Sequence, residues 1–235
     1  SWDYVVLQDQ SQVPTFPTTN GVWQDSKNAS VSLSHAIEDE GGETVLFMTW
    51  GYRDGDSLNS FNNNFTTMQE RLLEGYTRYA ENISAAGNTV WMAPVGLAYK
   101  TVHDNVLSGG VDPTTSGNLF YDLYSSDGSH PSLSGSYLAA CVFHSTTTGE
   151  HCVGSTDSVN LNAATKLALQ QAADDTVFNQ TSGMSYYPWE TSGMSAFGLG
   201  SSVPQGWYIQ WQDDELANIP AGGSTSATLS ITVPS

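Results

Sequence analysis

Three short apolar runs, separated by helix-forming stretches, most limit the folds open to this chain. They are residues 3–8 (DYVVLQ), 43–50 (ETVLFMTW) and 88–95 (NTVWMAPV). Runs of this length without polar alternation are typical of strands buried on both faces. The stretches between them repeat apolar residues at helical spacing and end at glycines, as residues 65–86 do at Gly87. This alternation predicts a parallel sheet covered by helices, a three-layer α/β/α sandwich of the flavodoxin-like kind.

A change of composition near residue 178 divides the chain into two parts. Residues 1–178 carry the alternating strands and helices. Residues 179–235 are rich in serine and glycine, and within them residues 207–211 and 226–233 alternate like half-buried strands. We therefore expect an α/β domain over 1–178. We expect a β-rich extension over 179–235 that packs on this domain or forms a small β module.

The charge of the chain excludes several classes of partner. Six Lys and Arg residues against 24 Asp and Glu residues give a formal net charge of −18. Such a surface repels phosphate backbones and anionic membranes, so we expect no nucleic-acid partner and no membrane role. No stretch reaches the ~20 apolar residues of a membrane-spanning helix. No cofactor is expected.

Two cysteines flank a short polar loop. Cys141 and Cys152 are favoured as a disulfide, because closing this loop would stabilise the fold by about 3 kcal/mol on the chain-entropy model. His144 and His151 lie in the same region, so a Cys/His metal cluster is the alternative. Their spacing matches none of the usual zinc patterns, and no metal site is expected.

Four Asn-x-Ser/Thr sequons bear on the compartment of the protein. They begin at Asn28, Asn64, Asn82 and Asn179. A single sequon is weak evidence, but four beside a local disulfide are typical of a secreted chain. We therefore expect a secreted glycoprotein.

The stretch SSDGSHPSLSGSYLAAC, residues 125–141, carries the clearest catalytic pattern. Asp127 lies three residues before His130, and Pro131 follows the histidine. Pro131 keeps His130 out of helical geometry, so the segment is expected to turn and to fold the carboxylate back onto the imidazole. The carboxylate would then fix the ring tautomer and leave the other nitrogen as a base. The alternative is a hydrogen-bonded turn with a surface histidine.

This block resembles the last conserved block of the SGNH (GDSL-type) hydrolases, in which an Asp-x-x-His pair precedes a proline and a helix. Residues 2–12 are similar to the central strand and loop of that family, residues 45–56 to the next strand, and residues 90–100 to the strand before the catalytic block. The resemblance implies a three-layer α/β sandwich that hydrolyses esters on carbohydrates, lipids or small acyl compounds. It also implies that His130 is the general base and that Asp127 orients it.

Two departures from the family pattern matter. The nucleophilic serine of the family lies in a Gly-x-Ser block before the central strand, and this sequence begins at the central strand without that block. The loop that usually carries an oxyanion-hole asparagine reads QDQSQ here, so the donor would be Gln8, Gln10 or Gln12. Ser11 lies in the same loop without a Gly-x-Ser elbow, and we expect it to line the site rather than act as nucleophile.

A second polar segment follows a predicted strand. Residues 50–56 (WGYRDGD) place Trp50, Tyr52, Arg53 and Asp54 where they could line a pocket. Because cations are scarce in this chain, a structural ion pair of Arg53 with Asp54 or Asp56 is an equal alternative. Three tryptophans in the last third of the chain suit either a carbohydrate-stacking platform or, as we favour, the core of a β layer: Trp189, Trp207 and Trp211.

Three functions stay open on these residues. The first is a secreted SGNH-type esterase for a small ester or carbohydrate ester, with its nucleophile outside this sequence. The second is an inactive SGNH-like protein with a binding role, and the third is a subunit of an extracellular assembly that docks through residues 179–235. A sheet without its first strands would expose the edge of its central strand, so we expect a companion segment or a neighbouring subunit to cover it.

Overall fold

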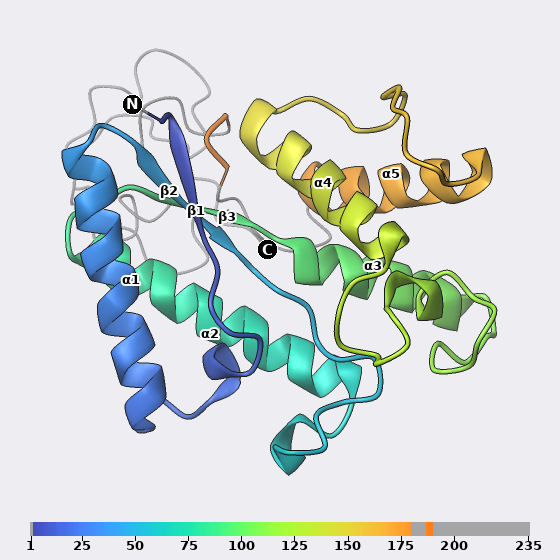
Figure 1. Cartoon of the computed structure of the whole chain (residues 1–235), viewed down its shortest axis with the longest axis horizontal. Helices are drawn as coiled ribbons and strands as arrows, with labels where there is room; N and C mark the ends of the chain where they lie inside the picture. The colour runs from blue at the N-terminus through green and yellow to red at the C-terminus, as the bar shows by residue number, and fades with distance from the viewer. Residues whose placement is uncertain (1, 180–186, 190–235) are drawn as a thin grey trace, which may run out of the picture.

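Three parallel strands and five helices alternate along the chain in the computed structural model, which describes residues 2–179 and 187–189 (Figure 1). The predicted α/β class is therefore confirmed. The elements are β1 (Tyr4–Leu7), α1 (Gly21–Asp39), β2 (Glu43–Phe47), α2 (Phe65–Ala85), β3 (Val90–Ala93), α3 (Val95–Ser108), α4 (Leu133–Thr148) and α5 (Ala163–Val177). Three short 3-10 turns add to these: Val13–Thr15, Ser60–Asn62 and Tyr121–Leu123.

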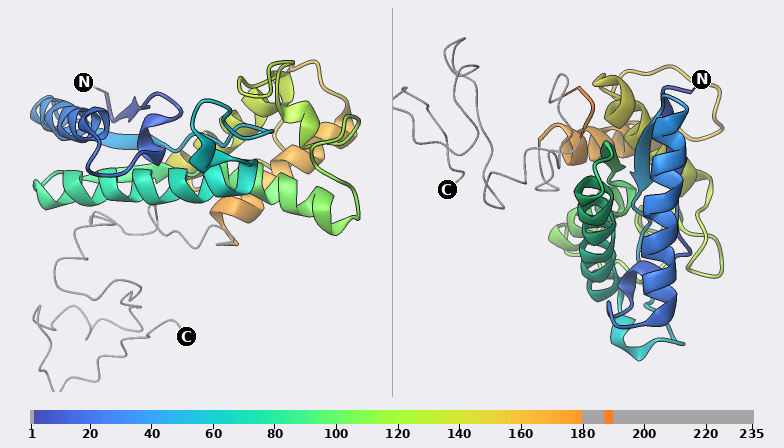
Figure 2. Two further views of the ribbon diagram at one scale, coloured as in Figure 1. Left: turned by 90° about the horizontal axis from the view of Figure 1, so that it is seen from below. Right: turned by 90° about the vertical axis from the view of Figure 1, so that its left-hand side faces the viewer.

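The sheet has the strand order β1-β2-β3, with Val6 beside Val45 and Val45 beside Trp91. Its side chains alternate between two cores, as the period of a strand requires. Val45 and Trp91 belong to the core shared with α4 and α5, whereas Leu46 and Met92 belong to the core shared with α1 and α2. Figure 1 shows α1 and α2 on one side of the labelled strands and α4 and α5 on the other, and Figure 2 gives the same elements from two further directions. The molecule is thus the expected three-layer sandwich.

The central and edge strands differ in burial. All residues of β3 and three of the five residues of β2 are buried, as a strand covered on both faces requires. β1 is only half-buried, and Val6 is 45% exposed. The prediction that residues 3–8 form a strand buried on both faces is therefore wrong for β1. The reason is its position, because β1 pairs with β2 alone among the described residues and lies at one edge of the sheet.

Polar caps explain where the helices that frame the site begin. The side chain of Asn64 accepts the backbone N–H of Thr67 at 2.8 Å and starts α2. Ser132 accepts the backbone N–H of Ser134 at 3.1 Å and starts α4. These caps satisfy amides that have no partner inside the helix. Because Ser132 follows Pro131 directly, the start of α4 also determines where the His130 turn lies.

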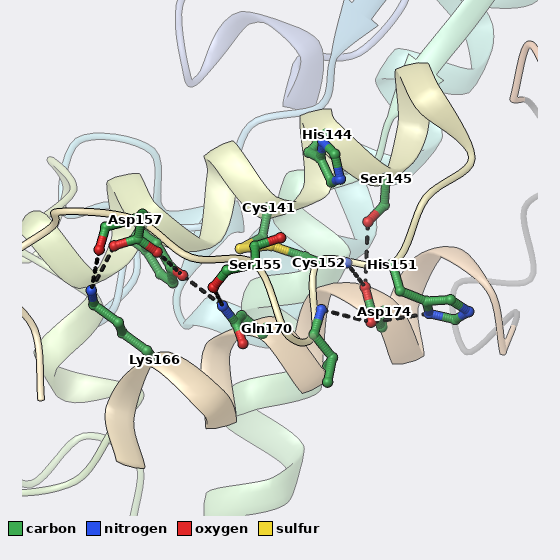
Figure 3. The surroundings of a disulfide bond; sticks show 12 residues. Cys141, His144, Ser145, His151, Cys152, Ser155, Asp157, Lys166, Gln170 and Asp174 are labelled. Carbon is green, nitrogen blue, oxygen red and sulfur yellow. Dashed lines mark hydrogen bonds and ion pairs between the residues drawn. A yellow bond between two sulfur atoms is a disulfide. The ribbon is translucent and has the colours of Figure 1, made fainter. Parts of the chain in front are cut away.

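The predicted disulfide is present and joins α4 to the loop that leads to α5. Cys141 and Cys152 are bonded, with their Cα atoms 5.4 Å apart. Beside them the buried Asp174 of α5 accepts the backbone N–H of Cys152 at 2.8 Å, and its other oxygen lies 3.1 Å from Nδ1 of His151 (Figure 3). His151 therefore helps to hold the loop of Cys152 against α5. No group of three or more His, Cys, Asp or Glu residues that could hold a metal occurs within residues 2–179 and 187–189.

The first described residues of the C-terminal part pack on the α/β domain. Tyr187 is fully buried and stacks on Trp189, with ring centroids 5.4 Å apart. The Trp189 indole N–H donates to the carbonyl of Ser145 in α4 at 3.0 Å. Trp189 thus packs on the α/β domain, and the β layer in which we expected it stays a prediction. The predicted β-rich extension, including Trp207 and Trp211, lies outside the described residues. Within those residues no helix has the length and apolar character needed to span a membrane.

Candidate active site

Asp127 and His130 form the predicted pair on the turn before α4. The Asp127 Oδ2 atom lies 2.7 Å from Nδ1 of His130, and Oδ1 accepts the backbone N–H groups of His130 at 2.9 Å and Ser129 at 2.8 Å. These hydrogen bonds, that from the His130 amide above all, hold the pKa of the Asp127 carboxyl well below its usual range. An ionised carboxylate can only accept, so Nδ1 carries a proton and Nε2 is left as the base.

The backbone of this turn is closed by its own hydrogen bonds. Ser125 N–H donates to the carbonyl of His130 at 2.8 Å, and Gly128 N–H donates to that of Ser125 at 3.0 Å. The Ser125 hydroxyl donates to the carbonyl of Pro131 at 2.9 Å. Gly128 has a φ of +71°, which an L side chain rarely adopts. The Asp-Gly-Ser-His sequence therefore forms one defined turn, although the His130 side chain is 79% exposed.

The loop after β2 supports the turn from behind. The Trp50 indole N–H donates to the Ser129 carbonyl at 3.0 Å, and the Arg53 backbone N–H donates to the Gly128 carbonyl at 2.8 Å. The Trp50 ring is stacked on the fully buried ring of Tyr99, with centroids 4.7 Å apart and planes 6° apart. The position of the base is thereby linked to the core through Trp50.

Arg53 follows the structural alternative of the two that its sequence left open. Its Nε and Nη2 atoms donate to one carboxylate oxygen of Asp54 at 3.0 and 2.7 Å, and the guanidinium lies 4.0 Å from the ring centroid of Tyr121. The hydrogen bond that Arg53 donates to Asp54 raises the pKa of Arg53. A Cβ atom on Gly128 would lie 3.0 Å from Nη2 of Arg53. Arg53 therefore packs under the turn and is absent from the pocket lining.

A cavity of about 420 Å³ lies where β1 and β2 end, and His130 is on its wall. Parallel sheets place their active groups at this edge. The cavity brings together Gln8, Trp50 and His130, three of the residues that the sequence singled out, and Ser11. The full lining is Gln8, Ser11, Phe47, Thr49, Trp50, Tyr52, Ser129, His130, Pro131, Ser136 and Ala139.

The structure separates the three glutamines that the sequence could not rank. Only Gln8 lines the cavity, and the described part of the chain offers its amide no hydrogen-bond partner. Gln12 donates its amide N–H to Oδ2 of Asp56 at 2.9 Å. Gln10 is exposed, and its amide oxygen accepts the backbone N–H of Gln12 at 2.9 Å. Gln8 is therefore the one of the three whose N–H groups remain for a ligand in the cavity.

Sequence reasoning missed the residues that anchor and complete the cavity. The Tyr79 hydroxyl in α2 donates to Oδ2 of Asp9 at 2.8 Å and pins the loop that follows Gln8. Burial, reinforced by Asp9, raises the pKa of the Tyr79 phenol, which stays protonated and keeps donating. Thr49 and Ser136 were also missed. The place of Thr49 just after a strand was the available signal, whereas nothing in the sequence links Asp9 to Tyr79.

Comparisons with known proteins bear on the fold. No protein-family model matches the chain, and no curated protein matches it. The structure of a DUF4886 family protein from Bacteroides uniformis matches with 19% identity over 77% of this chain and 64% of that chain, at a TM-score of 0.57. A protein from Slackia heliotrinireducens, provisionally assigned to the SGNH hydrolases, matches with 28% identity over 61% of this chain and 64% of that chain, at a TM-score of 0.44. The first likeness shows a shared fold alone, and this chain spans less than two thirds of either neighbour.

Proposed function

We propose that the protein is an ester hydrolase of the SGNH type, in which Asp127 and His130 activate a serine. The observation that carries this proposal is the 2.7 Å contact between Asp127 and Nδ1 of His130 on the wall of a cavity at the carboxyl end of the sheet. His130 Nε2 takes the proton of the serine hydroxyl as the serine attacks the ester carbonyl, and later returns it to the leaving alcohol. Asp127 keeps the tautomer and stabilises the imidazolium.

Gln8 is our candidate for the oxyanion donor. Its amide lines the same cavity as His130 and has no partner among the described residues. An amide N–H aimed at the developing alkoxide would stabilise the tetrahedral intermediate. Gln10 accepts the backbone N–H of Gln12, and the Gln12 amide donates to Asp56. Both side chains already have partners and do not line the cavity, so they are less suited to this role.

We place the nucleophile on a Gly-x-Ser segment that adds a strand to the open edge of β1. Support comes from β1 itself, because Val6 is 45% exposed and β1 pairs with β2 alone within residues 2–179 and 187–189. An open strand edge is an aggregation hazard that proteins normally cover. The segment belongs to a longer form of this chain or to a companion chain. Ser11 lines the same cavity, 3.4 Å from the Tyr52 hydroxyl, and is the internal competitor.

Turnover of 4-nitrophenyl acetate tests the proposal. Residues 1–235 alone are expected to hydrolyse this ester slowly. The protein completed by the Gly-x-Ser segment, called the completed protein below, should hydrolyse it readily. Turnover should fall strongly in His130→Ala and somewhat less in Asp127→Ala. His144→Ala is the matched control, because His144 is a histidine of α4, the helix that follows His130, and does not line the cavity. No turnover by any completed form would favour the alternative, an inactive SGNH-like subunit of an extracellular assembly.

We further propose that the protein is a secreted glycoprotein. The Cys141–Cys152 disulfide is compatible with an oxidising compartment. The sequon residues Asn28, Asn64 and Asn179 are exposed, whereas Asn82 is half-buried. Glycans are therefore expected at the three exposed sites before Asn82. Intact mass of protein secreted from a glycosylating host, before and after glycan removal, tests this, and an unchanged mass would contradict it.

A further inference from the structure

The cavity wall carries aromatic rings and no fixed charge. Among the described residues that line it there is no Lys, Arg, Asp or Glu. Phe47 and Trp50 lie at an angle to each other, with ring centroids 6.1 Å apart and planes 56° apart, and Tyr52 lines the same cavity. One face of the Trp50 ring is covered by Tyr99. Aromatic rings on a cavity wall can attract a cation, and quaternary ammonium groups are the ligands that aromatic walls recognise best.

Three carboxylates belong to residues that contact or neighbour the residues of this wall. Asp127 contacts His130, and Asp9 follows Gln8 in the chain. Asp56 accepts the amide N–H of Gln12, the neighbour of Ser11. Asp9 is held by the neutral hydroxyls of Tyr79 at 2.8 Å and Ser26 at 3.1 Å, and Asp56 by neutral amides, so that neither charge is cancelled by its partners.

Five of the six Lys and Arg residues have interactions that do not involve these carboxylates; the sixth, Lys27, is in α1 next to Ser26. Arg53, the cation next to the turn, is neutralised by Asp54. Three more of the six Lys and Arg residues pair with acidic side chains elsewhere: Arg78 with Glu74, Lys100 with Asp104 and Lys166 with Asp157. Arg71 lies over the Phe61 ring, 5.3 Å from its centroid. A cavity whose lining has no charged Lys, Arg, Asp or Glu and whose neighbours include these carboxylates, in a chain of net charge −18, is expected to attract cations.

We infer from these observations that the cavity prefers esters that carry an ammonium group over neutral esters of the same shape. This inference rests on the proposed hydrolase function and specifies its substrate class. The rings of Phe47, Trp50 and Tyr52 contact the ammonium group, and the nearby carboxylates attract it from solution. His130 and Gln8, which line the same cavity, act on the ester group.

Two acetate esters that differ only in charge test this preference in the completed protein. Acetylcholine carries a quaternary nitrogen where 3,3-dimethylbutyl acetate carries a carbon. The kcat/KM of each ester is divided by its rate constant for hydrolysis by hydroxide, which corrects for intrinsic reactivity. The corrected value for acetylcholine should exceed that for 3,3-dimethylbutyl acetate by about tenfold at low ionic strength. The ratio should shrink as salt screens the carboxylates. A ratio of one or below, or a ratio that salt leaves unchanged, would overturn the inference.

A matched pair of variants tests the origin of the preference. Ser136 is exposed and lines the cavity, so Ser136→Lys adds one positive charge there, and Ser136→Gln adds a neutral side chain of similar reach. The acetylcholine preference should fall at least severalfold in Ser136→Lys relative to Ser136→Gln, and equal ratios in the two variants would contradict the electrostatic account.

The hydrolase proposal can fail separately from this inference. If neither ester is hydrolysed, the hydrolase function fails, and binding of the alcohols still decides the preference. Choline or 3,3-dimethylbutanol is then added stepwise to the protein, and the chemical shifts of the His130 ring are followed by NMR to give each dissociation constant. Tighter binding of choline at low salt supports the inference, and equal or weaker binding refutes it.

Discussion

Replacement of Trp50 by phenylalanine should weaken the base without unfolding the protein. Phenylalanine keeps a ring against Tyr99 but removes the indole N–H that donates to the Ser129 carbonyl at 3.0 Å. One such hydrogen bond is worth about 1 kcal/mol of the free energy of unfolding, which lowers Tm by about 3 °C for a domain of this size. Ser129 directly precedes His130, so the backbone next to the base loses a hydrogen bond that holds it in place.

The effect on catalysis should exceed the effect on stability. Small displacements of a catalytic group cost large factors in rate. For the neutral substrate 4-nitrophenyl acetate we expect kcat of the completed protein to fall about tenfold with KM little changed. Hydrogen exchange at the amides of residues 127–130 should also become faster than in the wild type. This second readout needs no activity, because Asp127 accepts two of these amides.

Trp91→Phe is the matched control for this prediction. Trp91 in β3 also donates its indole N–H, to Glu43 at 2.6 Å, and it is buried and does not line the cavity. Its loss should cost about 1–2 kcal/mol of the free energy of unfolding, as much as Trp50→Phe or more. It should leave kcat and the exchange at residues 127–130 unchanged. Equal loss of kcat in both variants, or none in Trp50→Phe, would refute the positioning role of Trp50.

Three further predictions concern the fold and the turn. Thiol labelling of denatured, unreduced protein should find no free cysteine, and Cys141→Ser with Cys152→Ser should lower the free energy of unfolding by about 3 kcal/mol in denaturant titrations; two reactive thiols per chain would disprove the bond. The depressed pKa of Asp127 means that its carboxylate stabilises the native state above the unfolded pKa of about 3.9 and loses this contribution as the pH falls toward the lower native pKa. Urea titrations of Asp127→Asn should therefore differ from wild type at pH 6, and the difference should shrink only as the pH falls well below about 3.9 toward the native pKa; a difference that stays constant over that range would contradict the assignment. Gly75→Ala should lower the free energy of unfolding by about 3 kcal/mol or more, because its Cβ would lie 1.9 Å from the Pro14 carbonyl oxygen. Gly87→Ala, with open space but a φ of +97°, should lower it by about 1 kcal/mol. Similar midpoints of urea unfolding for the two variants would argue against the packing of α2 on the Val13–Thr15 turn.

The sheet and the turn were predictable because their signals are local. Continuous apolar runs identified β2 and β3, and the order Asp127, Gly128, His130, Pro131 contains the carboxylate, the flexible residue and the helix stop that the turn needs. The disulfide was predictable for the same reason, since only a short loop separates its cysteines.

The composition of the cavity wall was not predictable, because it depends on contacts between distant segments. Gln8 lines the cavity while Gln12 turns away, and the choice depends on Asp56, which lies 44 residues from Gln12. Arg53 could have faced the cavity, but Asp54 and the ring of Tyr121 hold it beneath the turn. The half-buried state of β1 depends on its place in the sheet, which an apolar run does not reveal.

Labelling with a fluorophosphonate tests most directly whether His130 activates a serine in this protein. The completed wild-type protein, His130→Ala and His144→Ala are treated with the reagent and digested, and the modified serine is located by mass spectrometry. We predict rapid modification of one serine in a Gly-x-Ser segment in the wild type and in His144→Ala, and very slow modification in His130→Ala. Modification that is equally fast in His130→Ala would contradict the assignment of His130 as the base.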